Sequence, residues 1–206
     1  MKSTWFIADT HFGHANIIRY SKRPFATVDD HDRQLVENWN TFVKPGDDVF
    51  HLGDFAYRNR ESALKLLEQL NGNVHLIEGN HDAAAHQIRA HFVWYDKVKT
   101  VKVNDRRIFL SHYAHRVWEK SHHGAWHLYG HSHASLPDDP NSLSFDAGID
   151  NTAIRLGRPE LYGSGDLPDT GLQAQDYRPI HFDEVEAVMA RKTFVPVDHH
   201  GADRGD

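Results

Sequence analysis

The chain has 206 residues, of which 39% are apolar and 25% charged, with a formal net charge of −6 and no cysteine. This composition is typical of a globular protein, and the missing cysteines exclude disulfides and thiolate metal sites. No apolar run is long enough to cross a membrane and no signal peptide is evident, so we expect a cytoplasmic protein without a membrane partner. The acidic balance argues against duplex nucleic acid as a partner unless a second protein supplies basic surface. The sequence makes no prediction of oligomeric state.

The first half of the chain alternates predicted strands and helices. Hydrophobic periodicity and turn residues predict a strand at 4–9, an amphipathic helix at 29–43, a strand within 45–56, a helix at 61–72 and a strand at 73–79. This order is typical of parallel β-strands linked by helices.

The second half has more strands. We expect a helix at 83–95, a hairpin at 97–113, strands at 125–133 and 142–150, and a strand followed by a helix at 178–192 with Asp183 as N-cap. The whole pattern predicts an α/β protein with two sheets covered by helices. Residues 1–195 would form one domain, with a loop-rich excursion at 151–178 and a disordered tail at 196–206.

The 18 histidines are the most unusual feature of the composition. Histidine is both a common metal ligand and a neutral-pH acid or base. Polar clusters follow five predicted strands, in the motifs DTH, GD, GNHD, SH and GHSH (Asp9 and His11; Asp54; Asn80, His81 and Asp82; His112; His131 and His133). Strand ends gather at one edge of an open α/β sheet, so we expect these side chains to meet. If the strands continue through DTH and GHSH, the two polar residues of each motif point the same way.

Carboxylate, imidazole and amide donors without sulfur suit borderline divalent ions, with Mn²⁺ expected first and Fe²⁺, Zn²⁺ or Ni²⁺ as alternatives. Two such ions roughly 3.5–4 Å apart can bind a hydroxide between them and clamp a phosphoryl group. Asp54 is central in the order of the motifs and follows a glycine, so it is the candidate to bridge two ions.

Each motif has an ordinary alternative when it is taken alone. DTH and GD are common, and GNHD could be a simple turn. GHSH is more specific, because a glycine-flanked pair of alternating histidines rarely serves packing. The joint order of all five motifs, each at a strand end, is what indicates a metal site.

This set of motifs resembles the signature of the calcineurin-like metallophosphoesterase superfamily: D-x-H, G-D, G-N-H-[DE], H and G-H-x-H. The resemblance covers roughly residues 3–150 together with 178–192. The opening DTHFGHANIIRY and the later RPF further resemble a small bacterial and phage branch of predicted phosphoesterases. The resemblance implies a four-layer sandwich of two mixed β-sheets flanked by helices.

The resemblance also implies a role for each polar residue. One ion would be held by Asp9, His11, Asp54 and His133, and the other by Asp54, Asn80, His112 and His131. His81 would not bind metal but would stabilise or protonate the leaving oxygen, which agrees with the need of an alkoxide leaving group for a neutral-pH acid. His81 and the bridging Asp54 are therefore the catalytic candidates.

One position departs from the family pattern. In the protein-phosphatase branch a second Asp, three residues after G-D, orients the catalytic histidine, whereas this chain has Tyr57 there. Asp82 becomes the candidate for orienting His81, although it could equally cap the following helix. Arg58 matches a phosphate-binding Arg of that branch, and His14 lies close to DTH, so both are candidate substrate contacts. An exposed loop arginine is the alternative for Arg58.

We therefore expect a dinuclear-metal phosphoester hydrolase, and in particular a phosphodiesterase acting on a small or nucleotide-type substrate. The diesterase is preferred because the chain lacks the large substrate domains of many protein phosphatases and nucleotidases. The alternatives are a phosphomonoesterase of the same fold, a nuclease subunit of a repair assembly, and a non-catalytic metal-binding scaffold.

Overall fold

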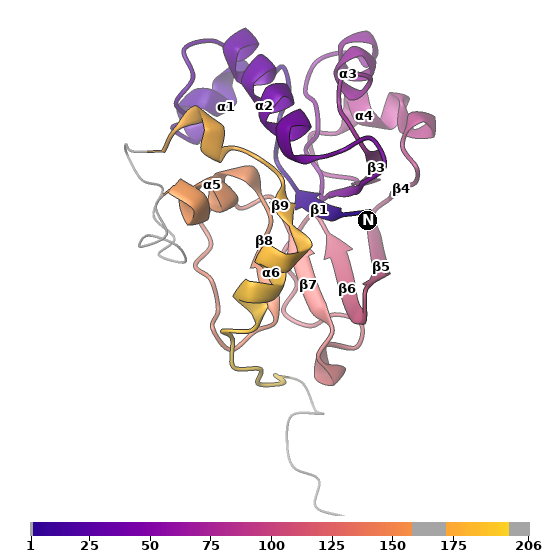
Figure 1. Cartoon of the computed structure of the whole chain (residues 1–206), viewed down its shortest axis with the longest axis vertical. Coiled ribbons are helices and arrows are strands. Elements are labelled where there is room, and N and C mark those ends of the chain that lie inside the picture. Colours follow the sequence, from indigo (N-terminus) through magenta and orange to yellow (C-terminus); the bar gives the residue numbers. More distant parts are fainter. Residues whose placement is uncertain (1, 158–171, 198–206) are drawn as a thin grey trace, which may run out of the picture.

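Two β-sheets pack face to face with helices around them (Figure 1). A computed structural model describes residues 2–157 and 172–197. The first sheet has the strand order β4-β3-β2-β1-β9 and the second the order β5-β6-β7-β8. The predicted α/β fold of two mixed sheets flanked by helices is confirmed.

The first sheet carries the early βα units. Its strands β1 (Thr4–Ile7), β2 (Asp48–His51), β3 (Asn73–Ile77) and β4 (Tyr95–Asp96) are parallel, and β9 (Ile180–His181) pairs antiparallel with β1. Its connecting helices are α1 (Ala15–Tyr20), α2 (Val28–Phe42), α3 (Arg60–Leu67) and α4 (Ala83–Gln87). Thr27 caps α2 by accepting from the backbone N–H of Asp30 at 3.1 Å, and Leu35 and Trp39 of that helix are buried beneath it.

The second sheet begins with the predicted hairpin, β5 (Val98–Val103) and β6 (Arg106–Ser111), followed by β7 (Trp126–Tyr129) and β8 (Ser144–Asp146) in parallel. Helix α5 (Ile149–Gly157) follows β8, and α6 (Phe182–Met189) follows β9. Inward-facing side chains of both sheets share one core, including Phe6, Leu52, Leu110, Leu128 and Phe145. Burial of each such side chain contributes about 1.5–3 kcal/mol.

The two sheets meet where β1 and β8 end. The backbone N–H of Ala8 donates to Ala147 at 3.0 Å, and that of Ile149 donates to Ala8 at 3.0 Å, so that Ala8 and Gly148 form an isolated parallel bridge. This bridge brings the loop that follows β1 next to the start of α5. Residues from both sheets can therefore enter one site.

Two predictions about helices need correction. The helix expected at 83–95 is only α4 and a 3₁₀ turn at Arg89–His91, because the chain must return to pair as β4. The N-cap of α6 is His181 and not Asp183: the N–H of Asp183 donates to His181 Nδ1 at 3.2 Å, and Glu184 completes a capping box. The helix starts earlier because it follows β9 directly.

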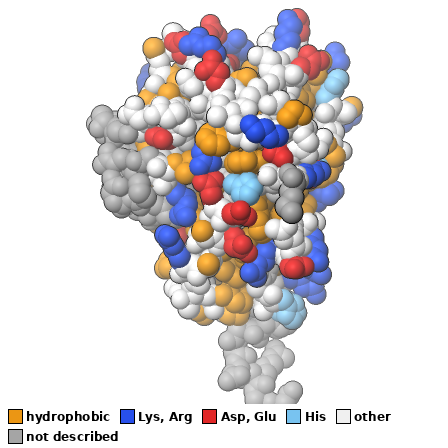
Figure 2. Space-filling view, in the orientation of Figure 1, with side chains coloured by type: hydrophobic (Ala, Val, Ile, Leu, Met, Phe, Trp, Pro, Cys, Tyr) orange, Lys and Arg blue, Asp and Glu red, His pale blue; other side chains and the backbone are white. Residues whose placement is uncertain are grey.

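The predicted excursion at 151–178 is wrong at its start, because 151–157 belong to α5. Residues 158–171, and 198–206 of the predicted tail, lie outside the described residues. No helix within residues 2–157 and 172–197 is long and apolar enough to span a bilayer. On the face in Figure 2 the described acidic and basic side chains are interspersed, without a continuous basic stripe.

Candidate metal centre

The predicted ligands lie on loops just beyond the strands. β1 ends at Ile7, β2 at His51 and β7 at Tyr129, before the motifs begin. Five of the predicted ligands have positive φ values between 46° and 71°: Asp9, His11, Asp54, His131 and His133. Such conformations cost on the order of 1–3 kcal/mol each and cluster at functional sites. The prediction that the strands continue through DTH and GHSH is therefore wrong. His131 and His133 of GHSH do not lie side by side on one strand face but belong to two different groups of potential ligands.

Two groups of potential ligands form at this point. The first consists of Asp9, His11 and His133, and the second of Asp54, His112 and His131. Within each group one ligand atom per residue lies within 4.8 Å of the others. We call them the first group and the second group.

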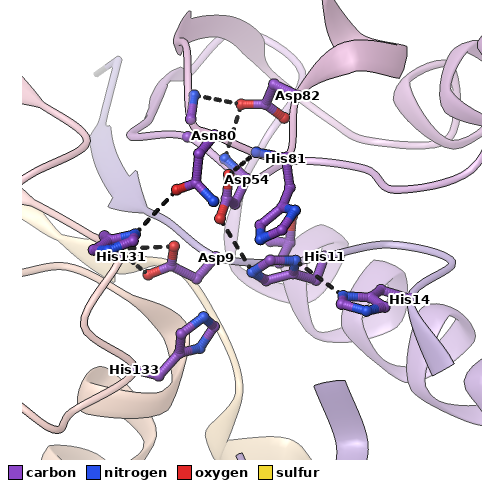
Figure 3. A network of polar contacts seen from close by, with 12 residues as sticks. Asp9, His11, His14, Asp54, Asn80, His81, Asp82, His131 and His133 are labelled. Carbon is purple, nitrogen blue, oxygen red and sulfur yellow. Dashed lines mark hydrogen bonds and ion pairs between the residues drawn. The ribbon is translucent and has the colours of Figure 1, made fainter. Parts of the chain in front are cut away.

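Asn80 completes the second group. Its Oδ1 lies 3.0 Å from His112 Nε2. The same oxygen lies 3.0 Å from His131 Nδ1 (Figure 3). An amide oxygen flanked by two imidazole nitrogens is an arrangement that a divalent ion can use, because all three atoms offer lone pairs when the imidazoles are neutral.

Asp54 lies between the two groups. Its Oδ2 is 3.4 Å from His11 Nε2 in the first group and 3.5 Å from His112 Nε2 in the second. Its Oδ1 accepts from the backbone N–H of His81 at 2.8 Å. One carboxylate thus faces both groups and the loop that carries His81. Figure 3 shows its contacts with His11 and with the backbone of His81.

The His81 side chain is exposed beside this arrangement. Its ring centroid lies 5.4 Å from that of His11, 6.0 Å from that of Tyr57 and 6.1 Å from that of His14. Tyr57 in turn stacks on His14 with the centroids 4.1 Å apart and the planes 14° from parallel. The His81 ring therefore stands at the rim, beside an aromatic surface made by His14 and Tyr57.

Known proteins match this chain along most of its length. The calcineurin-like phosphoesterase superfamily domain matches residues 3–147. The chain belongs to the calcineurin-like phosphoesterase superfamily. It is thus a metal-dependent phosphoesterase with Asp and His groups that could hold the metal.

Individual relatives of this phosphoesterase come from archaea, phages and bacteria. The uncharacterised protein MJ1445 of Methanocaldococcus jannaschii is 35% identical over 141 residues, which are 68% of this chain and 74% of the relative. The gene 66 protein of Mycobacterium phage L5 is 25% identical over 194 residues, 79% of this chain and 93% of the relative. The crystal structure of AQ665 from Aquifex aeolicus, a protein of unknown function, covers 91% of this chain and 100% of its own, with a TM-score of 0.62 and 21% identity, and so supports the fold.

Electrostatics prepare the phosphoesterase site for cations. Burial, followed by the charge of Arg23, lowers the pKa of His11 to about 2, so this imidazole is neutral. Its Nε2 is buried and makes no hydrogen bond among the described residues, and the Asp54 carboxylate 3.4 Å away has no proton to donate to it. An unpaired buried nitrogen costs about 1–3 kcal/mol, and a metal ion would satisfy it. The unpaired Nε2 of His11 is therefore the feature of the site that most clearly suits a bound metal ion.

Asp82 holds backbone and not the imidazole. Its Oδ2 accepts from the N–H of Asp54 and of Gly79, both at 2.8 Å, and its Oδ1 accepts from that of Phe55 at 2.7 Å. It occupies the N-cap position of α4 but makes no side-chain cap bond, so the capping interpretation is wrong. Among the described residues no carboxylate is hydrogen-bonded to the His81 ring, and the orienting role of Asp82 reaches His81 only through the two loops that it joins.

Arg58 lies against the loop that carries His14. Its Nε donates to the carbonyl oxygen of Gly13 at 3.3 Å and its guanidinium pairs with Asp29 at 3.4 Å. These bonds use Nε and one NH2 hydrogen of the five N–H donors of the guanidinium. His14 is nearer the groups, with its Nδ1 3.4 Å from His11 Nδ1.

Two glycines allow the loops to approach each other closely. Gly53 has φ +101°, and a Cβ atom there would collide with the His112 ring. A Cβ at Gly79 would collide with the carboxylate of Asp54. Only residues without side chains fit at these places, which explains the glycines of GD and GNHD.

Two residues that support the first group were not among the predicted site residues. Asp150 Oδ2 lies 2.7 Å from His133 Nδ1, and Arg23 pairs with Asp150 at 2.8 Å. Arg23 and Asp150 are 127 residues apart in the chain. The motif RPF contains Arg23, but no local pattern indicates its distant partner.

Proposed function

We propose that this phosphoesterase is a phosphodiesterase that uses two divalent metal ions, with Mn²⁺ expected first. The observation that carries the proposal is the meeting of the two ligand groups at Asp54, whose Oδ2 lies within 3.5 Å of an imidazole from each. Asp9, His11 and His133 would hold one ion with Asp54. Asn80, His112 and His131 would hold the other with Asp54.

The bound ions would activate water for in-line attack and neutralise charge on the phosphate. The chain's own groups do the rest. His81 stands at the open rim and would give a proton to the leaving oxygen, since it is an exposed imidazole beside His11 that is not itself a proposed ligand. The backbone N–H of His81 donates to Asp54 Oδ1 at 2.8 Å, which holds the loop that carries this acid next to the proposed bridging carboxylate.

A small substrate with an aromatic or nucleotide group suits the surroundings of the site. Tyr57 is 53% exposed and Tyr113 is 50% exposed, although large aromatic side chains are usually buried. Tyr113 also donates to Asn80 Oδ1 at 3.3 Å, so its ring lies next to the second group. A base or another flat group could stack on either ring, which contributes about 1–3 kcal/mol per base in proteins that bind single strands.

The test compares bis(4-nitrophenyl) phosphate with 4-nitrophenyl phosphate, with Mn²⁺ added, in the wild type and in Asp54→Asn. We expect faster hydrolysis of the diester and a loss of about 100-fold or more in Asp54→Asn, because a neutral amide oxygen cannot bridge two cations as a carboxylate does. A faster monoester rate would make the protein a phosphomonoesterase. A wild type that binds two ions but hydrolyses neither ester would make it a scaffold, and full activity in Asp54→Asn would contradict the bridging role. The cytoplasmic location stays a prediction.

A further inference from the structure

Arg23 is a fully buried cation close to the first group but not part of it. Its side chain has 0% exposure, and it lies in the connection between α1 and α2. A buried guanidinium is costly unless its charge and its hydrogen-bond donors are matched. Arg23 is matched completely: its five N–H donors meet five acceptors.

These five acceptors converge from separate parts of the chain. Nε and one NH2 hydrogen donate to the two carboxylate oxygens of Asp150, both at 2.8 Å. The other NH2 hydrogen donates to the carbonyl of Asp9 at 2.7 Å. NH1 donates to the carbonyl of Thr10 at 3.1 Å and to His31 Nε2 at 2.8 Å. Arg23 therefore hydrogen-bonds both to the backbone of the DTH loop and to the carboxylate of Asp150.

Asp150 links Arg23 to His133. Its Oδ2 lies 2.7 Å from His133 Nδ1, so Nδ1 carries a hydrogen and donates it. The remaining nitrogen, Nε2, is then the lone-pair donor of His133. A carboxylate behind a histidine ligand fixes the ring and its tautomer, and it raises the basicity of the imidazole.

The contacts extend to the far side of the same loop. His31 Nδ1 lies 2.9 Å from Asp32 Oδ1, and that oxygen also accepts from the N–H of Gly13 at 3.0 Å. For Arg23 to donate to His31 Nε2, His31 must be neutral. Burial lowers the pKa of His31, which agrees with that requirement. The DTH loop, with positive φ at Asp9 and His11, is thus held from both ends.

The second group is supported differently. Among the described residues, His112 Nδ1 lies 2.8 Å from the backbone carbonyl of Leu52 and not against a carboxylate, and Asp82 holds Asp54 only through its backbone N–H. Arg23 hydrogen-bonds to the residues that carry or support Asp9 and His133, and none of its bonds reaches Asp54, His112 or His131.

We infer that Arg23 and Asp150 are positioning residues for the first group alone, and that they make its ion the more tightly held of the two. The inference rests on the proposed pair of metal ions. Lysine cannot replace Arg23, because an ammonium group has three donors and lacks the planar fork that pairs with a carboxylate through two bonds.

The test is a Mn²⁺ titration of metal-free protein, followed by calorimetry and metal analysis, for the wild type, Arg23→Lys and Asp150→Asn. Two ions bound by the wild type, with unequal affinities, are expected first; this measurement tests the proposed function itself. In both variants we expect the tighter ion to bind about 10–100-fold more weakly while the other keeps its affinity. The weakened ion should be the one that His133→Ala abolishes and His131→Ala retains.

Arg178→Lys is the matched control. Arg178 also forms a two-bond pair with a carboxylate, Glu184, at 3.0 and 2.7 Å, but the pair lies at α6 and not at the site. It should leave both affinities unchanged. The inference is overturned if Arg23→Lys leaves both ions unchanged, or if it weakens both ions equally. Loss of both ions together with the far-ultraviolet circular dichroism signal would also overturn it, because Arg23 would then support the fold as a whole. A wild type with one ion would overturn the proposed function instead.

Discussion

At the scale of single residues, the position of His81 has an explanation that does not need a carboxylate partner. Tyr57 stands where a protein phosphatase has its orienting Asp, and the ring of Tyr57 lies 6.0 Å from that of His81. The His81 backbone is fixed by Asp54, whose loop is fixed by Asp82. Backbone placement beside the rings of His11 and Tyr57 thus replaces a side-chain hydrogen bond.

His81→Ala should depend on the leaving group. A nitrophenolate leaves without a proton, whereas an alkoxide needs one, so general-acid loss should cost about 10²–10⁴-fold for an alkyl ester and much less for a nitrophenyl ester. The measurement is kcat/KM of the variant and of the wild type on two kinds of substrate. One is bis(4-nitrophenyl) phosphate, and the other is a series of methyl phosphodiesters whose second leaving group rises in pKa from nitrophenol to an alkyl alcohol. A loss of the same size across the series would show that His81 does not act as the acid.

Asp82→Asn should loosen the loops around the site. The variant places an NH₂ group against one of three backbone N–H donors, which leaves a buried donor unpaired and costs about 1–3 kcal/mol. Urea unfolding measures this change in the free energy of unfolding. Asp105→Asn, in the exposed turn of the hairpin, is the control and should change it by less than about 0.5 kcal/mol. Equal stability of Asp82→Asn and the wild type would contradict the three bonds.

At the scale of elements, the strands were predictable and the loops between them and the ligands were not. Apolar runs predict β1, β2 and β3, because a buried strand needs little else. The positive φ values of Asp9, His11 and Asp54 leave no local signal, since tertiary contacts impose them. The motifs indicate which residues meet. The hydrogen bonds from Arg23 to Asp150 and from His133 to Asp150 show that residues far apart in the chain hold these ligands in place.

Gly53→Ala should disturb the second group through the backbone. Its φ of +101° disfavours a side chain, and a Cβ would collide with the His112 ring. We expect a lower melting temperature and loss of the ion of the second group, measured by thermal denaturation and metal titration. Gly46→Ala has open space around it and should behave as the wild type. Retention of both ions in Gly53→Ala would show that the close approach of the Gly53 backbone to the His112 ring is not needed for metal binding.

At the scale of the whole molecule, the proposed site lies where the two sheets join. Asp9 and Asp54 follow strands of the first sheet, and His112 and His131 follow strands of the second. A bound ion would therefore connect the sheets as well as serve the reaction. Binding to the folded chain alone stabilises it by about 2.7 kcal/mol when the free ion is at 100 times its Kd.

Metal affinity should increase with pH. Burial opposes protonation of His112, but its hydrogen bond to Asp54 and the charges of Asp9 and Asp54 outweigh it and raise its pKa to about 9. The metal-free protein therefore carries this proton below pH 9, and an ion must displace it. Affinity should rise from pH 6 toward pH 9, with release of about one proton per ion of the second group. Calorimetry at pH 7.5 in buffers of different ionisation enthalpy counts that proton, and binding without release would contradict the ligand role of His112.

We propose above all that two ions meet at Asp54 and act together. The most direct measurement is a stepwise Mn²⁺ titration of metal-free protein in which bound metal and bis(4-nitrophenyl) phosphate hydrolysis are followed in the same samples. We predict two ions per chain, with hydrolysis appearing as the second ion binds. Saturation at one ion per chain, or full activity before the second ion binds, would contradict the account.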